Sequence, residues 1–195
     1  MLNELSKTQA GRAALRPRLV AAGWDYLVIV VWLTLLAVVF VPLYLAGVRP
    51  FDGLGMVGSD LLITVLSVLP VGAYLTIGEA GRHHATWGKR RAGLVVVTTR
   101  GKRPGAARII VRNVVKLLPW QCAHMAVSRL AGGQEAIIAM PLLVAAYALA
   151  GVSIALLLVR RDRAALHDVV VATRVVPSPL SIPSNRGDGP MPQRP

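Results

Sequence analysis

The sequence has little charge, few acidic residues and a single cysteine. Only 16% of its 195 residues are charged, and 22 Lys and Arg outnumber nine Asp and Glu, which gives a formal net charge of +13. A soluble basic domain normally carries more charge than this. At the same time 54% of the residues are hydrophobic. The composition therefore excludes a simple soluble domain, argues against disorder of the main body, and predicts a membrane protein with basic loops.

Residues that support catalysis, metal binding or a disulfide are equally scarce. Cys122 is the only cysteine, which excludes an internal disulfide, and no supporting arrangement of His and Asp marks it as a nucleophile. His83 and His84 alone are too few ligands for a metal site. The segment 88–91 contains a Gly-Lys pair, but its spacing departs from that of a phosphate-binding loop. We therefore expect no enzyme activity, no cofactor, no metal and no nucleic-acid partner.

Three long stretches contain no charged residue and predict membrane-spanning helices. They have 23, 18 and 24 residues and cover Tyr26–Val48, Leu61–Gly78 and Ala136–Val159. A helix rises about 1.5 Å per residue, so about 20 residues cross a hydrocarbon core of about 30 Å. The full spans are expected at about 19–48, 59–79 and 136–159. The first is too long for a signal peptide and is expected to remain as an anchor.

The distribution of basic residues predicts the orientation of these spans. Four Lys and Arg precede Tyr26, one lies between the first two spans, eleven lie between Gly78 and Ala136, and six follow Val159. Basic residues favour the cytoplasmic side, which places the N-terminus inside and residues 49–60 outside. Three spans would leave the basic C-terminal segment outside. An even number of crossings, with both termini cytoplasmic in a bacterial plasma membrane, removes this conflict.

The candidate for a fourth membrane element is the segment 107–131. Arg108, Arg112 and Lys116 recur every four residues among apolar residues, which predicts an amphipathic helix in the headgroup plane. Pro119 is expected to break or kink this helix. The short second half then enters the bilayer. In the alternative, the whole segment is interfacial and the C-terminal side violates the charge rule.

Two short β-branched segments predict strands outside the membrane. Gly93–Thr99 and Val169–Val176 are expected to pair with each other on the cytoplasmic side. The last 19 residues, 177–195, contain six prolines and are predicted to be disordered. The chain thus divides into a basic tail (1–16), a membrane domain (17–176) and a Pro-rich tail. The fold class is a mainly α polytopic membrane protein with a small β element.

Asp25 is the most informative charged residue, because it stands at the start of the first span. A carboxylate inside a bilayer costs about 2.5–3.5 kcal/mol at mid-depth on insertion scales, and less near the interface. Arg18 lies on the same side of the helix but too far away to pair directly, so Arg112 or Lys116 is the better partner. Two interpretations remain open: a proton or cation site, and an ion pair that fixes one helix against another.

Other basic residues are expected at the membrane surface. Lys89, Arg90, Arg91 and Arg108 are candidates for binding anionic lipid headgroups, each contributing about 1 kcal/mol. The expected partners are the bilayer, anionic lipids, and either a second copy of the chain or another membrane protein.

Four separated motifs carry a resemblance to a known family. They are RPRLVAAGWDYLV (Arg16–Val28), ATWGKRRAGLVVV (Ala85–Val97), RNVVKLLPWQCAH (Arg112–His124) and RAALHDVVVATRVV (Arg163–Val176). In this order they resemble motifs of the RDD family of small bacterial membrane proteins, over residues 17–176. The family is named for an arginine and two aspartates, and the resemblance assigns these letters to Arg18, Asp25 and Asp168. One departure is that Val171 and Ala172 precede Thr173, where family members commonly place Ala-Gly.

Two functional hypotheses follow. In the first, the protein is a small transporter or cation/proton exchanger that works as an oligomer, with Asp25 as the protonatable group and Arg18 and Arg112 setting its charge state. The resemblance implies transport only loosely. In the second, it is a non-catalytic membrane module that binds a partner protein or anionic lipid through its basic cytoplasmic face.

Overall fold

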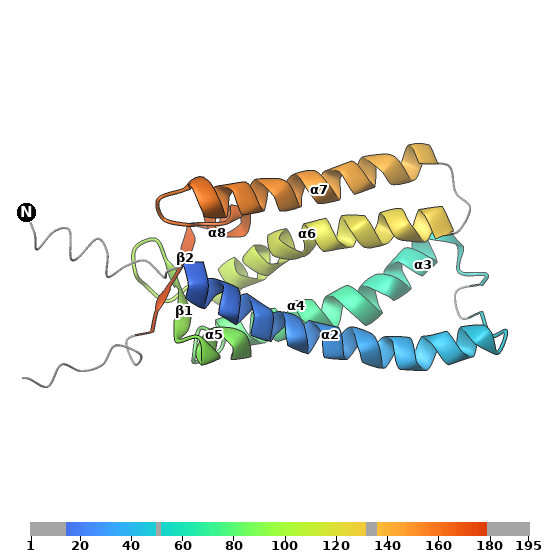
Figure 1. Cartoon of the computed structure of the whole chain (residues 1–195), viewed down its shortest axis with the longest axis horizontal. Coiled ribbons are helices and arrows are strands. Elements are labelled where there is room, and N and C mark those ends of the chain that lie inside the picture. The colour runs from blue at the N-terminus through green and yellow to red at the C-terminus, as the bar shows by residue number, and fades with distance from the viewer. Residues whose placement is uncertain (1–14, 50–51, 132–135, 179–195) are drawn as a thin grey trace, which may run out of the picture.

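Long helices running along one axis form most of the molecule (Figure 1). The computed structural model describes residues 15–49, 52–131 and 136–178. The elements, in chain order, are α2 (Leu15–Leu45), α3 (Gly55–Ile63), the π-helical turn η1 (Thr64–Val68), α4 (Leu69–Ala80), α5 (Trp87–Arg91), β1 (Leu94–Thr98), α6 (Ala106–Ala131), α7 (Ala136–Val159), α8 (Leu166–Val170) and β2 (Thr173–Pro177). The predicted fold class is confirmed. The predictions for the two tails lie outside the described residues, except at 15–16 and 177–178.

Three helical segments are long and apolar enough to cross a membrane, as predicted. They are α2, with 31 residues, the continuous run α3–η1–α4 (Gly55–Ala80), with 26, and α7, with 24. The π-helical turn within the second segment comes directly before Pro70, which lies in the first turn of α4. Proline lacks a backbone N–H, so a local change of hydrogen-bond spacing at this place is expected.

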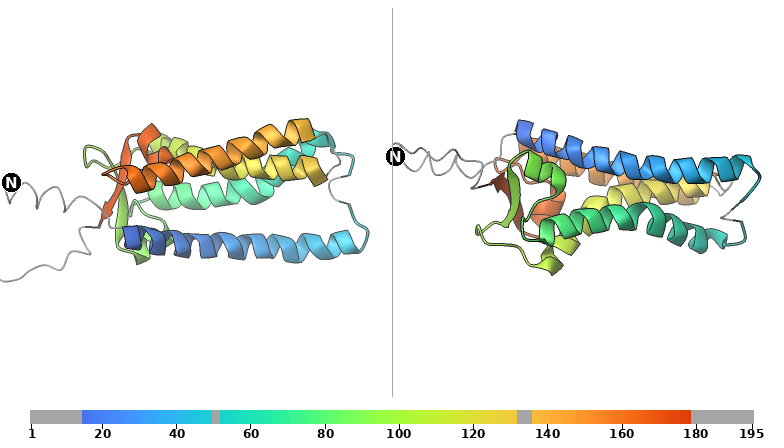
Figure 2. Two further views of the ribbon diagram at one scale, coloured as in Figure 1. Left: turned by 45° about the horizontal axis from the view of Figure 1, so that its top comes forward. Right: turned by 90° about the horizontal axis from the view of Figure 1, so that it is seen from below.

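The fourth element differs from its prediction, because Pro119 does not interrupt it. Helix α6 continues from Ala106 to Ala131, which at about 1.5 Å per residue is about 39 Å. It lies beside α7 and α4 along the length of the bundle (Figures 1 and 2). Neighbouring helices allow proline inside membrane helices, because they stabilise the distorted turn. Helix α6 is not among the three helical segments that are long and apolar enough to cross a membrane, but it packs along α7 and α4 within the bundle.

A small β ribbon closes one end of the bundle. Strands β1 and β2 pair antiparallel, with Leu94 opposite Pro177 and Thr98 opposite Thr173. The predicted pairing is confirmed, but β2 starts at Thr173 and not at Val169. The preceding residues form the short helix α8 instead. We call the end that contains α5, α8, β1 and β2 the polar end.

The packing of the helices is uneven. Helices α6 and α7 form a long pair, and α4 packs on α6, whereas α2 packs chiefly on α5 at the polar end. Only Ala21 and Asp25 are buried in α2, and its most hydrophobic window has no buried residue. At the opposite end, the Arg129 Nη2 atom lies 2.7 Å from the Asp60 Oδ2 atom and joins α6 to α3. The apolar outer surface of α2 is therefore left for lipid or for another protein.

Candidate functional site

Asp25 lies at the polar end, where several elements meet its carboxylate. The hydroxyl of Tyr74 donates to Oδ1 at 2.7 Å, and that of Thr86 donates to Oδ2 at 2.6 Å. The backbone N–H of Gly88 donates to Oδ1 at 2.9 Å. The Lys89 Nζ atom is 3.8 Å from Oδ2. The predicted pairing of Asp25 with Arg112 or Lys116 is wrong, because these three hydrogen bonds and Lys89 occupy the carboxylate.

The first turn of α5 is shaped to approach α2 closely. Thr86 caps the helix by accepting a hydrogen bond from the Lys89 N–H at 3.3 Å while its hydroxyl donates to Asp25. A Cβ atom on Gly88 would lie 2.3 Å from the backbone oxygen of Ala21 and 2.7 Å from Asp25 Oδ1. Only glycine fits there. The Thr-Trp-Gly-Lys segment thus brings the backbone N–H of Gly88 to the carboxylate of Asp25.

Glu79 is the centre of a buried ion network. Its side chain is fully buried at the end of α4. Lys89 donates to its Oε1 atom at 2.8 Å, and Arg112 donates to its Oε2 atom. The amide of Asn113 also approaches Oε2, at 3.4 Å. One carboxylate therefore links α4, α5 and α6.

The network continues from Arg112 to Asp168 on α8. Atoms Nε and Nη2 of Arg112 lie 3.1 and 2.9 Å from Asp168 Oδ1. The Thr173 hydroxyl donates to the same oxygen at 3.1 Å. Both charged side chains are almost completely buried. Arg112 thus bridges two carboxylates, those of Glu79 and Asp168. Asp168 lies on the short helix α8, which stands where the start of the second strand was expected.

The charge states on α8 follow from this surrounding. Burial alone would raise the pKa of Asp168, but the charge of Arg112 and the hydrogen bond from Arg112 outweigh it and lower that pKa. Burial, reinforced by the charge of Arg112, lowers the pKa of His167 to about 3, although Asp168 acts in the opposite direction. His167 is therefore neutral near pH 7, and its Nε2 atom at 3.7 Å from Asp168 forms no ion pair there.

Arg18 reaches the same region without a hydrogen-bonded acid. Its Nη1 atom donates to the carbonyl of Arg163 at 2.6 Å, and its Nη2 atom donates to the carbonyl of Val175 at 2.9 Å. It therefore ties the start of α2 to the turn before α8 and to β2. Arg18 is more than 140 residues away in the sequence from both of these acceptors.

A cavity of about 260 Å³ lies against this network. Four cationic side chains and two carboxylates line it: Arg18, Lys89, Arg112, Lys116, Asp25 and Asp168. Apolar side chains such as Ile29, Leu75 and Leu157 form other parts of its wall. Among the described residues Lys116 makes no hydrogen bond and no ion pair within 4.0 Å, and Glu79 and Asp25 are the acidic residues whose charges act on it. The cavity therefore brings together the family-motif residues that the sequence singled out and leaves the ammonium of Lys116 without a hydrogen-bond acceptor in the described part of the chain.

The four residues predicted to bind lipid headgroups divide into two groups. Arg90, Arg91 and Arg108 are exposed, so they remain available for anions. Lys89 is buried and paired with Glu79, so this part of the prediction is wrong. Its alkyl chain and ammonium point into the protein because α5 turns that face toward α2 and α4.

Arg91 also contributes to the contact between α2 and α5. Its guanidinium carbon lies 4.9 Å from the ring centre of Trp87 and 5.4 Å from that of Trp24. The two rings meet edge to face at 5.2 Å. Cation–π and aromatic contacts of this kind stabilise an interface beyond the area that they bury. They hold α5 against α2 next to the Asp25 site.

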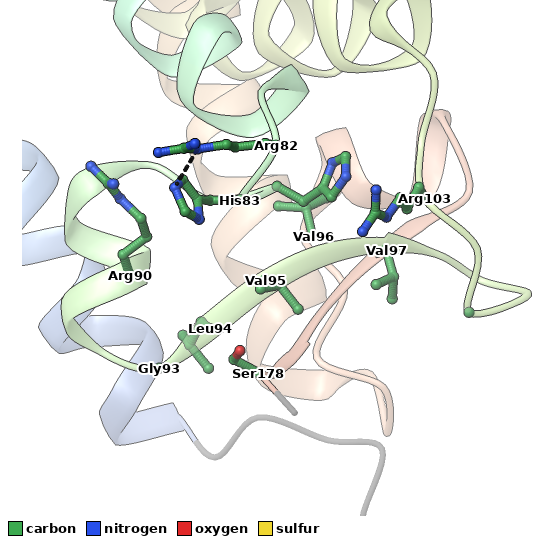
Figure 3. A pocket seen from close by; sticks show the side chains of 12 residues that line it. Arg82, His83, Arg90, Gly93, Leu94, Val95, Val96, Val97, Arg103 and Ser178 are labelled. Atoms are coloured by element: carbon green, nitrogen blue, oxygen red, sulfur yellow. Dashed lines mark hydrogen bonds between the residues drawn. The ribbon is translucent and has the colours of Figure 1, made fainter. Parts of the chain in front are cut away.

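A second hollow, of about 530 Å³, lies beside β1 at the polar end. Arg82, Arg90 and Arg103 come to it from three different segments, and Arg82 donates to His83 Nε2 at 3.1 Å (Figure 3). Within the described part of the chain, no group of three or more His, Cys, Asp or Glu residues is placed to hold a metal ion.

Sequence reasoning missed Glu79, although a signal was present. The buried residues of α4 are Val71, Leu75 and Glu79, which follow each other at four-residue spacing. Such spacing places all three on one helix face. Glu79 therefore continues an apolar stripe, and a carboxylate in that position requires a buried cation. Tyr74 and Thr86, the two hydroxyl donors to Asp25, had no comparable signal.

The fold and this network define a helical membrane protein with a buried ion cluster at one end of the bundle. The model of the RDD family matches residues 12–172, which is most of the chain. The protein belongs to the RDD family. Comparisons with curated proteins and with solved structures gave no match. The residues that the resemblance assigned to the family name, Arg18, Asp25 and Asp168, all line the 260 Å³ cavity.

Proposed function

We propose that the protein is a non-catalytic membrane module that binds an anionic lipid in the 260 Å³ cavity, with the polar end on the cytoplasmic side of a bacterial plasma membrane. The observation that carries this proposal is Lys116, a cation that lines the cavity and makes no hydrogen bond or close ion pair among the described residues. Placing an ionisable side chain away from water costs free energy, so such residues are rare and usually have a function. A bound phosphate would supply the missing partner.

The charge balance of the cavity supports an anion over a cation. Four cations face three carboxylates even when Glu79, which lies directly behind Lys89 and Arg112, is included. A cation would add to this surplus, whereas a phosphate would reduce it. The apolar wall and the sparse packing of α2 beside the cavity suit an amphiphile that enters from the bilayer. The basic exterior formed by Arg90, Arg91 and Arg108 would attract the same lipids to the membrane surface.

The test is the stabilisation of the full chain by phosphatidylglycerol, measured as the rise in Tm on transfer from pure phosphatidylcholine nanodiscs. We expect Lys116→Met to remove most of this rise. The matched control is Arg108→Gln, which removes one charge from an exposed position on the same helix and should leave most of the rise intact. Equal losses in the two variants would contradict a cavity site and indicate diffuse surface attraction.

Cation or proton exchange is the second candidate, because Asp25 is a carboxylate within the first span and lines the same cavity. A monomer of four helical segments offers little room for a transport path, and the exposed length of α2 would support an oligomer. The three hydrogen bonds to Asp25 hold its carboxylate in place and argue for a structural role. The experiment is ion flux in reconstituted vesicles. Exchange through Asp25 requires that Asp25→Asn abolish the flux, and equal flux in both proteins would rule it out.

A further inference from the structure

The hollow beside β1 is separate from the cavity that contains Lys116. It is lined by three arginines, by His83 and His84, and by the strand residues Leu94–Val97 (Figure 3). Its volume of about 530 Å³ lies within the range of small-molecule sites. The hollow has no part in the ion network described above, so its composition requires a separate explanation.

The charge of this hollow is of one sign. Arg82, Arg90 and Arg103 are exposed, and among the described residues that line the hollow there is no Asp or Glu. Arg82 has only His83 as its partner, and Arg90 and Arg103 make no side-chain ion pair with the described residues. Guanidinium groups present several donors in a fixed plane and match phosphate oxygens better than an ammonium does. The arginines therefore suit a phosphate group.

The backbone of His84 has a left-handed conformation, which is unfavourable for residues other than glycine. Its φ is 48°, in the left-handed region, and its carbonyl accepts a hydrogen bond from the Val96 N–H at 2.8 Å. The Nδ1 atom of its ring is buried and has no hydrogen-bond partner within the described part of the chain. Strained conformations and unpaired buried polar atoms occur together more often at binding sites than elsewhere. His84 thus adds an independent observation to the three arginines.

The shape of the hollow indicates more than a single phosphate. Residues Leu94 to Val97 form its floor, and three residue steps along a strand cover about 10 Å. Figure 3 shows Arg90 near the Gly93 end of β1 and Arg103 near the Val97 end. Between them Val95 and Val97, which are half-buried, provide an apolar surface, whereas Leu94 and Val96 face the core. The site therefore fits a ligand that has a phosphate or diphosphate group and an apolar body.

We propose that this hollow is a binding site for such a phosphate-bearing small molecule. A soluble nucleotide and a phospholipid headgroup share this chemistry. Binding at the hollow does not depend on Lys116 or on the proposed function of its cavity, because the two sites share the apolar residue Leu94 but none of their charged residues. Its failure would therefore leave that function standing, and the reverse also holds.

The experiment uses the full chain in nanodiscs and has two arms. In the first, ADP and inorganic pyrophosphate are titrated calorimetrically into the protein in phosphatidylcholine. In the second, native mass spectrometry counts phosphatidylglycerol retained from mixed nanodiscs. The test variant is Arg82→Gln/Arg90→Gln/Arg103→Gln. The matched control is Arg16→Gln/Arg100→Gln/Arg161→Gln, which removes the same charge from exposed positions that do not line the hollow.

We expect the test variant to bind at least about tenfold more weakly in one arm, since a charge-assisted hydrogen bond typically contributes that much. The control should change binding by less than about threefold. The arm that shows the difference identifies a soluble or a lipid ligand. Failure of the wild type to bind in both arms, or equal weakening of the two variants, would overturn the proposal. If the triple variant does not fold, Arg90→Gln and Arg103→Gln are measured singly with the same criterion.

Discussion

Substitution of Glu79 by glutamine tests whether the buried network holds the polar end together. Glutamine keeps the shape of the side chain but removes its charge, so Lys89 and Arg112 lose the carboxylate that lies between them. Breaking a buried ion pair by removing one partner costs about 3–5 kcal/mol. We expect the lower end, about 3 kcal/mol, because Lys89 retains Asp25 at 3.8 Å and Arg112 retains Asp168 at 2.9 Å.

For a chain of this length, about 3 kcal/mol corresponds to a fall in Tm of about 6–12 °C. Tryptophan fluorescence during thermal unfolding in detergent gives the measurement. The matched control is Asp162→Asn, which breaks the exposed pair of Asp162 with Arg160, 2.9 Å apart. Exposed pairs contribute little to stability, so this Tm should hardly move. Equal Tm values for the two variants would refute the argument that Glu79 is the centre of the network.

A second variant separates loss of charge from loss of shape. In Glu79→Gln/Lys89→Met, the cation left in excess by the first change is removed together with the carboxylate. Asp25 keeps its hydrogen bonds from Tyr74, Thr86 and the Gly88 N–H. The double variant should therefore be more stable than Glu79→Gln alone, which is a non-additive result typical of contacting residues. A double variant that is less stable than the single one would show that Lys89 contributes mainly by packing.

Three further predictions concern single positions at the polar end, each measured as a change in Tm. Gly88→Ala should cost about 1–3 kcal/mol or prevent folding, since its Cβ would lie 2.3 Å from a backbone oxygen, and an unchanged Tm would contradict the close approach. Ala172→Gly should stabilise by about 0.5–1 kcal/mol, because φ is 51° at this position, and a lower Tm would contradict the strain. His167 is neutral in the folded protein, with a pKa of about 3, so below its ordinary value of 6.5 the unfolded chain binds one more proton. Stability should therefore fall by up to about 1.4 kcal/mol per pH unit as the pH drops below 6.5, and His167→Gln should reduce this slope. An unchanged slope would contradict the burial of the ring.

Much of the fold could be predicted because it depends on local patterns. Long charge-free stretches have few structural solutions, so the three spans were found to within a few residues at most ends. The pairing of the two β-branched segments was also predictable, since each is short and bounded by turns. Pro119 does not end the helix, because packing of α6 against α7 and α4 keeps both halves helical. Propensity acts within one segment and cannot include such neighbours.

The partners within the site could be predicted only in part. The sequence singled out Asp25 and offered Arg112 or Lys116 as its partner, whereas Asp25 meets Lys89, and Arg112 meets Glu79 and Asp168. Which charge meets which is decided by the rotation of each helix and by the turn before α5, and neither is encoded in residue spacing alone. Lys89 was assigned to the surface for the same reason, since α5 is too short to show a periodic pattern. The backbone at Ala172 is left-handed, with a φ of 51°, which is a conformation that glycine adopts without strain.

The buried ion network stabilises the fold inefficiently, because removing charged side chains from water costs free energy. This cost suggests that the network has a role besides stability. Burying paired charges often contributes no more than packed apolar side chains of the same volume would. What the network does achieve is geometric, because Lys89 and Arg112 are each held by two carboxylates and cannot turn freely toward the cavity. Arg18 is likewise fixed by two carbonyls. Of the four cations that line the cavity, Lys116 alone among the described residues keeps its donors uncommitted. A rigid frame around a cation whose donors are free favours the binding of an anion, and the proposed lipid site would use this arrangement.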